Sequence, residues 1–550
     1  MKTIFYILPI ILLSLTSCDI DRFPYDSIAS DELLGGEGGL EYATLGNYAR
    51  LKGDNVGNGF MPELHRMGEY PGDNVSLSGT TTDPLFFTYN YNNITTGYRT
   101  DDLWTPGYQA IVGCNKVIEL VAEGESTEQD QLIGENYYLR AYAFFEMVNV
   151  FGRPYSQGRS NLGIPLKLTT DINDLPDRST VGEVYDQVVS DLLKAESLMT
   201  INKSNSYATK EAAQALLSRV YLYMEENQKA IDYANKVISS GRFSLLSTTD
   251  LPNYTAINPD NNPETIFCFK FLEESDYESP YGTVGGLYAQ IDNQGYGEMY
   301  ASSTYLDILR RNPEDSRMGF IDPQYLKDDN GEKIPAVYWI NADYKYVFRR
   351  TFDKNGKTFF TDNEVDYEVL SEQNGDHTNY YYLNSTGEKQ YIINDFDIEK
   401  RNGYPKFFVL KCSLQDKVAQ LWSPVVSRLA EMYINKGEAY AKMGDMANAL
   451  ENVNVIRMRA GIPQYNDAAD FPEGYTLLDI ALEERRMEMA FEGQRKFDVF
   501  RNNKTMNRRY PGTHLTGGNP HLEIKPTDNR VIEFIPENQI IAQPSLTQND

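Results

Sequence analysis

The chain has 550 residues, and 79 Asp and Glu against 51 Lys and Arg give it a formal net charge of −28 at pH 7. A chain of this length can bury a substantial core, and length alone favours three or more domains. The acidic excess argues against binding of nucleic acid, which requires clustered Lys and Arg, and against electrostatic adhesion to anionic lipid.

The N-terminus carries a targeting signal. Met1 and Lys2 precede an apolar run over residues 4–15, which is too short to span a bilayer but suits the core of a signal peptide. The run ends in Leu-Thr-Ser-Cys at residues 15–18, which resembles the lipobox of bacterial lipoproteins. We therefore expect a signal peptide at 1–17 and a lipidated, palmitate-bearing tether at 18–30 that begins at Cys18. An ordinary cleaved signal peptide is the alternative. No later stretch is long and apolar enough to predict a transmembrane helix.

Residues 31–244 are predicted to form an N-terminal helical region. A first helix is expected within 31–52, followed by an aromatic loop at 53–100 that is rich in Gly, Asn, Thr and aromatic rings. Within 104–121 and 135–151, apolar residues recur every three or four positions, which predicts two helices. Thr180 and Glu183 have the spacing of a capping box that begins another helix, and Thr209 can cap the next.

Two segments show the spacing of tetratricopeptide repeats, in which small residues let paired helices approach closely and a large ring fills the space left by the neighbouring pair. These segments are 213–241 and 427–463, and the residues at repeat positions are Leu217, Ser218, Tyr221, Ala230, Ala234, Val237, Gly437, Tyr440, Ala449, Val453, Ile456 and Pro463. Two matches so far apart cannot form a continuous solenoid, so other helices must complete the stack. The predicted fold is mainly α, with a tetratricopeptide-like helical-repeat stack.

Residues 245–420 have little helical period and many turn pairs, such as Asn355-Gly356. Short strands are expected at 265–271, 337–340, 344–351 and 407–411, where β-branched and aromatic residues lie between turns. We interpret this region as an irregular, loop-rich subdomain that rests on the helical stack. Ligand-binding residues are expected here, because loops can vary without disturbing a scaffold.

The C-terminal region, 421–550, contains the stretch LEERRMEMAFEGQRKFDVFR at 482–501. Its interleaved charges and apolar residues predict one helix packed between other helices, whose carboxylates and guanidiniums pair with one another for structural reasons. The pattern ERRxExAFEGxRxFDxxR resembles the C-terminal signature of the SusD/RagB family. Further segments resemble that family in order, at 104–121, 135–166, 178–246, 263–269, 427–463 and 531–549.

This resemblance implies a glycan-binding lipoprotein on the exterior face of the outer membrane. It further implies a lid on a SusC-like, TonB-dependent β-barrel transporter, with the helical repeats facing the barrel and the loops facing the ligand. A peptide-capturing lid of the RagB type is one alternative. A tetratricopeptide scaffold that binds only proteins is another.

An enzyme is not predicted. The four histidines have no metal-binding spacing, and no nucleophile elbow, phosphate loop or complete dinucleotide fingerprint is present. Paired carboxylates would occur by chance in so acidic a chain and carry no specificity. No metal or other cofactor is expected, and the widely spaced Cys114, Cys268 and Cys412 are expected to be buried thiols.

Exposed aromatic rings can stack on the apolar faces of sugars while neighbouring polar side chains hydrogen-bond to hydroxyls. The ligand residues of the family match no motif, so our candidates come from composition in the aromatic loop and the middle region. They are Asp73, Tyr89, Tyr91, Tyr281, Tyr296 and Trp339.

Overall fold

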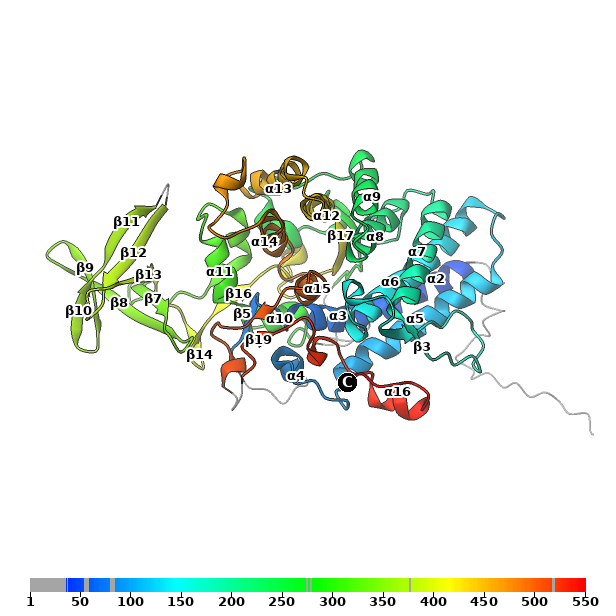
Figure 1. Ribbon diagram of the computed structural model, residues 1–550, viewed down its shortest axis with the longest axis horizontal. Coiled ribbons are helices and arrows are strands. Elements are labelled where there is room, and N and C mark those ends of the chain that lie inside the picture. Colours follow the sequence, from blue (N-terminus) through cyan, green and yellow to red (C-terminus); the bar gives the residue numbers. More distant parts are fainter. Residues whose placement is uncertain are drawn as a thin grey trace, which may run out of the picture.

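The computed structural model describes residues 36, 38–53, 59–79, 85–273, 276, 279–374, 377–516 and 520–550. The predicted signal peptide, Cys18 and the tether lie outside the described residues. In Figure 1 a helical body fills the right and centre of the molecule, and a β-sheet stands out from it on the left.

The helical body is built from long helices that pack on their neighbours in the sequence, together with several short ones. In the N-terminal half these are α2 (Gly39–Lys52), α3 (Phe60–Glu69), α4 (Leu85–Asn90), α5 (Tyr98–Leu120), α6 (Thr127–Phe151), α7 (Val181–Leu198), α8 (Lys210–Tyr223) and α9 (Asn227–Ser239). In the C-terminal half they are α10 (Val284–Tyr288), α11 (Ser303–Leu309), α12 (Leu429–Lys442), α13 (Met446–Ala460), α14 (Leu477–Met489), α15 (Arg495–Arg501) and α16 (Glu537–Ala542). The two predicted caps are present: Thr180 and Glu183 form a capping box at α7, and Thr209 accepts from the backbone of Ala212 at α8.

The two tetratricopeptide-like pairs, α8–α9 and α12–α13, adjoin although they are about two hundred residues apart in the sequence, because α9 packs on α12. Ser218 occupies the small-residue position of the first pair, and its hydroxyl donates to the carbonyl of Ala230 at 2.9 Å. The same hydroxyl accepts from Nδ2 of Asn435 on α12 at 3.1 Å. At the matching position of the second pair, a Cβ on Gly437 would lie 3.0 Å from Val453. The predicted mainly α, tetratricopeptide-like fold is confirmed.

The prediction of an aromatic loop at 53–100 is wrong for much of that segment. It contains α3, β1 (Val75–Leu77), α4 and the start of α5, and several of its rings are core residues. Gly68 of α3 serves close packing, because a Cβ there would lie 1.8 Å from the carbonyl oxygen of Gly493. Phe60 of α3 packs on Tyr142 of α6, whereas Tyr89 packs on His514 and Tyr91 on Phe500 in the C-terminal region.

The single helix predicted at 482–501 is interrupted. Helix α14 ends at Met489 and α15 begins at Arg495, with φ of +64° at Phe491 and +78° at Gly493 between them. The buried carboxylate of Glu69 on α3 accepts from the backbone N–H of Phe491 at 3.0 Å and of Gly493 at 3.1 Å. These bonds replace the hydrogen bonds that a continuous helix would have made, so the break depends on a tertiary partner.

The middle region is more regular than predicted, because it contains a seven-stranded antiparallel sheet with the order β10-β9-β8-β7-β13-β12-β11. Its strands are β7 (Pro335–Ile340), β8 (Tyr346–Lys354), β9 (Lys357–Asp362), β10 (Val365–Glu368), β11 (Leu370–Asn374), β12 (His377–Leu383) and β13 (Lys389–Phe396). The four predicted strands match β4 (Thr265–Cys268), β7, β8 and β16 (Phe407–Val409), and Asn355-Gly356 is a two-residue hairpin turn with positive φ at both positions. Strands β9 to β13 escaped prediction because most of their positions are exposed or half-buried, which weakens the apolar alternation.

Short strands tie loops together elsewhere in the described residues. They are β2 (Leu162–Pro165), β3 (Arg178–Thr180), β5 (Met299–Ala301), β6 (Ile321–Pro323), β14 (Lys400–Arg401), β15 (Tyr404–Pro405), β17 (Val425–Arg428), β18 (Met506–Asn507) and β19 (Glu523–Ile524). The pairs β1–β5 and β4–β17 join segments far apart in the chain. The three cysteines Cys114, Cys268 and Cys412 are buried free thiols.

Candidate functional site

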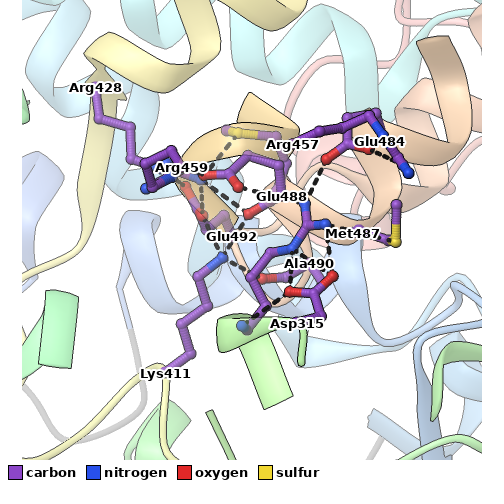
Figure 2. A network of polar contacts seen from close by, with 12 residues as sticks. Asp315, Lys411, Arg428, Arg457, Arg459, Glu484, Met487, Glu488, Ala490 and Glu492 are labelled. Carbon is purple, nitrogen blue, oxygen red and sulfur yellow. Dashed lines mark hydrogen bonds and ion pairs between the residues drawn. The ribbon is translucent and has the colours of Figure 1, made fainter. Parts of the chain in front are cut away.

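The densest group of charges lies in the interior, along α14 and the turn that follows it (Figure 2). Glu484 and Glu488 are four residues apart and share one side of α14, and Glu492 lies in the turn that follows the helix. Their cationic partners come from four other segments and are Arg317, Lys411, Arg428, Arg457 and Arg459. The ion pairs include Arg317–Glu484 at 2.7 Å, Arg428–Glu488 at 2.6 Å and Lys411–Glu492 at 2.6 Å.

Each of these carboxylates is already bound by cations of the same chain. Burial by itself would raise the pKa of Glu488, but Arg459, Arg428 and Arg317 hold it well below its usual range. Arg428 also pairs with Glu264, which precedes β4, at 2.8 Å. The network therefore joins the middle region to the C-terminal helices, and it has the structural role that the sequence indicates rather than the form of a reactive centre.

Three of the six candidate ligand residues lie in the interior. Asp73 pairs with Arg495 at 2.6 Å and with Arg486 at 3.4 Å; burial would raise its pKa, yet these two guanidiniums lower it to about 2. The hydroxyl of Tyr89 accepts from the backbone of Leu77 and bonds to His514 at 2.9 Å, and the side chain is fully buried.

Tyr91 is only 2% exposed and packs on Phe500. Because a ligand at the surface cannot reach these three side chains, the structure does not place them in a binding face. Their predicted role rested on a loop that is in fact folded into the core.

Trp339 lies on β7 of the seven-stranded sheet and packs against a cluster of buried residues within that sheet. Its ring centroid is 5.8 Å from that of Phe360 and 5.5 Å from that of Tyr382, and these residues form a small core within the sheet. The side chain is half-buried, so its contacts serve first to stabilise the sheet.

Tyr281 and Tyr296 form an exposed aromatic pair, which we call the tyrosine pair. Their ring centroids are 5.6 Å apart with an interplanar angle of 51°, and the two side chains are 42% and 53% exposed. Tyr281 precedes α10 and Tyr296 precedes β5, and α10 packs on α3 and β5. Of the six candidates, these two are brought together at the surface.

The backbone that carries the tyrosine pair is held in a defined shape. A tight turn at 291–294 has positive φ at Asp292 and Asn293, and the carbonyl of Asn293 accepts from the hydroxyl of Tyr281 at 3.3 Å. The backbone N–H of Tyr296 donates to the carbonyl of Gly286 at 2.7 Å. A Cβ on Gly286 would lie 2.4 Å from the carbonyl of Pro280, so glycine is required there. Rings that are fixed before binding lose little entropy on contact with a ligand.

The β14–β15 hairpin, whose polar side chains were not predicted, is bonded to the segment of Tyr296. Arg401 at the end of β14 donates to the carbonyl of Tyr296 at 2.9 Å and to the carboxylate of Glu298 at 2.7 Å. The next residue, Asn402, is exposed and donates to the carbonyl of Ser78 at 3.0 Å. No sequence signal could have found them, because about a hundred residues separate them from the tyrosines.

Several cavities lie away from this pair in the described part of the chain. A groove of about 820 Å³ runs between α5, the 165–176 loop and the C-terminal segment, and is lined by Trp104, Tyr108, Val112, Lys167, Leu175 and Leu546 among others. A small interior cavity of about 40 Å³ touches Glu146 and Arg219, whose charged groups are 3.6 Å apart. Burial raises the pKa of Glu146 to about 7 there.

In the described part of the chain, no group of three or more His, Cys, Asp and Glu side chains is placed to hold a metal ion. Over the same residues, no helix has the length and apolar character needed to cross a bilayer.

The sequence matches two family models in succession. A model described as starch-binding and associating with the outer membrane matches residues 56–222, and the SusD family model matches residues 263–550. The chain belongs to the SusD family. Membership places it, in general terms, among carbohydrate-binding proteins associated with the outer membrane, and confirms the resemblance seen in the sequence.

Relatives and solved structures extend the SusD likeness over nearly the whole chain. SusD-like protein P38 of Formosa agariphila is 26% identical over 503 residues, which cover 88% of this chain and 86% of that protein. A SusD superfamily protein from Bacteroides thetaiotaomicron superposes with a TM-score of 0.71 at 24% identity, covering 95% of this chain and all of that one. A putative sugar binding protein from Bacteroides vulgatus gives a TM-score of 0.67 at 23% identity, with 93% and 98% covered. At these identities the solved structures show the shared fold.

Proposed function

We propose that this SusD family protein captures an oligosaccharide at the cell surface and that the tyrosine pair is its main contact. The observation that carries the proposal is the pairing of two exposed rings on a fixed backbone, with Arg401 bonded to the carbonyl of Tyr296. Ring faces supply apolar contact with the C–H faces of a sugar, and the polar neighbours supply donors and acceptors for its hydroxyls. The family membership supports the same class of ligand.

The tilt of the rings bears on the shape of the ligand. Because the two planes are inclined at 51°, a flat ligand cannot lie against both ring faces at once. A sugar chain that turns between successive residues can present one face to Tyr281 and another to Tyr296. We therefore propose a bent oligosaccharide segment as the bound form.

We further propose that the protein hangs from the outer membrane by a lipid on Cys18, faces the exterior, and acts as a lid that delivers its ligand to a SusC-like, TonB-dependent β-barrel. The lipobox-like residues 15–18 and the family's association with the outer membrane support this. The buried carboxylates of Glu484, Glu488 and Glu492 are all paired with cations of the same chain, which supports a protein that binds its ligand without reacting with it. In this proposal the protein is a binding protein and not an enzyme.

Affinity electrophoresis against a panel of neutral and acidic polysaccharides tests glycan capture. Retardation by at least one glycan supports the proposal. Binding only to peptides in a parallel peptide panel would favour a RagB-like lid, and binding to neither would leave a tetratricopeptide scaffold as the better account.

Two cellular measurements test the anchor and the lid. Palmitate labelling should be present in the wild type and lost in Cys18→Ser. Extraction in mild detergent should recover a large β-barrel with the wild-type protein, and recovery of the protein without a barrel would contradict the lid.

A further inference from the structure

The charges around the tyrosine pair bear on the class of glycan that it accepts. Resting on the proposed function, we propose that the tyrosine pair selects uncharged oligosaccharides and rejects glycans that carry carboxylate or sulfate groups. The inference follows from how each charged group beside the rings is already used.

In the described part of the chain, two cations hydrogen-bond to the segments that carry the rings. Arg66 donates to the carbonyl of Gly282 at 2.8 Å, but its side chain is buried and pairs with Glu63, so its charge does not reach the surface. Arg401 is partly exposed, and its Nη2 lies 2.7 Å from the carboxylate of Glu298. A ligand carboxylate that approaches Arg401 therefore meets a neutral ion pair instead of a free positive charge.

Among the described residues 279–298, which carry the two rings, the remaining charge is negative. Asp292 is exposed in the same turn as Asn293, whose carbonyl binds the hydroxyl of Tyr281. Asp292, Glu298 and Arg401 together carry a formal charge of −1, and the whole chain carries −28. An anionic sugar would be repelled both locally and by the general field of the protein, an effect that salt screens.

The same arrangement suits a neutral ligand. A guanidinium has five N–H donors, and Arg401 uses two of them on Tyr296 and Glu298. The remaining N–H donors can bind sugar hydroxyls, because a hydrogen bond to a neutral hydroxyl does not require a net positive charge on the protein. Glu298 thus fixes the direction of Arg401 while it cancels its charge.

A matched pair of ligands tests the inference. The neutral glycan that gives the strongest retardation is compared with the same glycan after oxidation of its primary alcohols to carboxylates, which leaves the linkages intact. We expect weaker binding of the oxidised form at low salt, with part of the loss recovered as salt screens the repulsion. A loss that salt does not change would mean that the primary hydroxyls, and not charge, decide binding, and would overturn the inference.

The variant Glu298→Gln removes the counter-charge of Arg401. We expect the ratio of affinities for the oxidised and neutral forms to rise by about threefold to fivefold at low salt, the effect of one unit charge near contact in water. Glu473→Gln is the matched control: it makes the same charge change at an exposed residue in the turn before α14, and the ratio should stay the same. Thermal unfolding checks that both variants are folded.

The outcomes separate the two proposals. If the wild type binds acidic glycans as tightly as neutral ones, or binds only acidic ones, charge selection is wrong while glycan capture stands. An unchanged ratio in Glu298→Gln would likewise overturn the role of that residue. If no glycan of either kind binds, the proposed function fails and the inference fails with it.

Discussion

Replacing Tyr296 by alanine should weaken glycan binding by about tenfold. A tyrosine contributes about 150–250 Å² when fully covered, so a side chain that is 53% exposed offers roughly 100 Å² to a ligand. If a sugar covers about half of that area, the loss at about 25 cal/mol per Å² is about 1.3 kcal/mol. That free energy corresponds to roughly one factor of ten in the dissociation constant.

The measurement is a titration with the glycan that retards the wild type in affinity electrophoresis. Tyr391→Ala is a matched control, because Tyr391 is 51% exposed but lies on β13, outside the candidate site. Its affinity should equal that of the wild type, and both variants should keep the thermal unfolding temperature. Unchanged binding in Tyr296→Ala, or an equal loss in Tyr391→Ala, would refute the assignment of the tyrosine pair.

Three further substitutions test the interior and the sheet. Glu488→Gln should lower the free energy of unfolding at pH 7 by about 3–5 kcal/mol, because it leaves buried guanidiniums uncompensated. The fold depresses the pKa of Glu488, so the wild type keeps the contribution of this carboxylate to the free energy of unfolding above about pH 4.3 and loses it on acidification. The variant should lack that acid-dependent loss. Curves of unfolding free energy against pH that run parallel for the two proteins would contradict this. Glu146→Gln should change stability in the opposite direction. Because the pKa of Glu146 is raised to about 7, the wild type loses free energy of unfolding as pH rises from about 4.5 to 7, and the variant should be more stable at pH 8 by up to about 3 kcal/mol. Equal urea midpoints for the two proteins at pH 8 would argue against this. Trp339→Ala should lower the free energy of unfolding by about 2 kcal/mol while glycan binding is retained; lost binding at full stability would assign Trp339 to the site.

The break between α14 and α15 shows where local pattern stops being sufficient. The interleaved charges of residues 482–501 correctly indicate a packed segment, because the pattern depends only on which residues are charged and which are apolar. The prediction that these charges pair mainly with one another is wrong, because Glu484, Glu488 and Glu492 pair with cations of other segments. The turn at Phe491 depends on a carboxylate more than four hundred residues earlier in the chain, since Glu69 binds the free amides. A helical period cannot contain that information.

The candidate site divides in the same way. Composition favours tyrosines as sugar contacts, and it selects Tyr281 and Tyr296 together with Tyr89 and Tyr91. Only packing separates the exposed pair from the buried one, because an aromatic ring suits a core as well as a surface. Arg401 enters the site from a distant hairpin, and its pairing with Glu298 has no counterpart in local spacing.

From sequence alone, the SusD family, the mainly helical repeat architecture, the helix caps and the lipobox-like N-terminus can be inferred, because each depends on neighbours within a few turns of chain or on an ordered set of motifs. The tertiary structure decided which rings face water, where α14 ends and how a half-exposed region forms a seven-stranded sheet. Those features are set by contacts between residues tens to hundreds of positions apart, whose free energy exists only once the chain has folded.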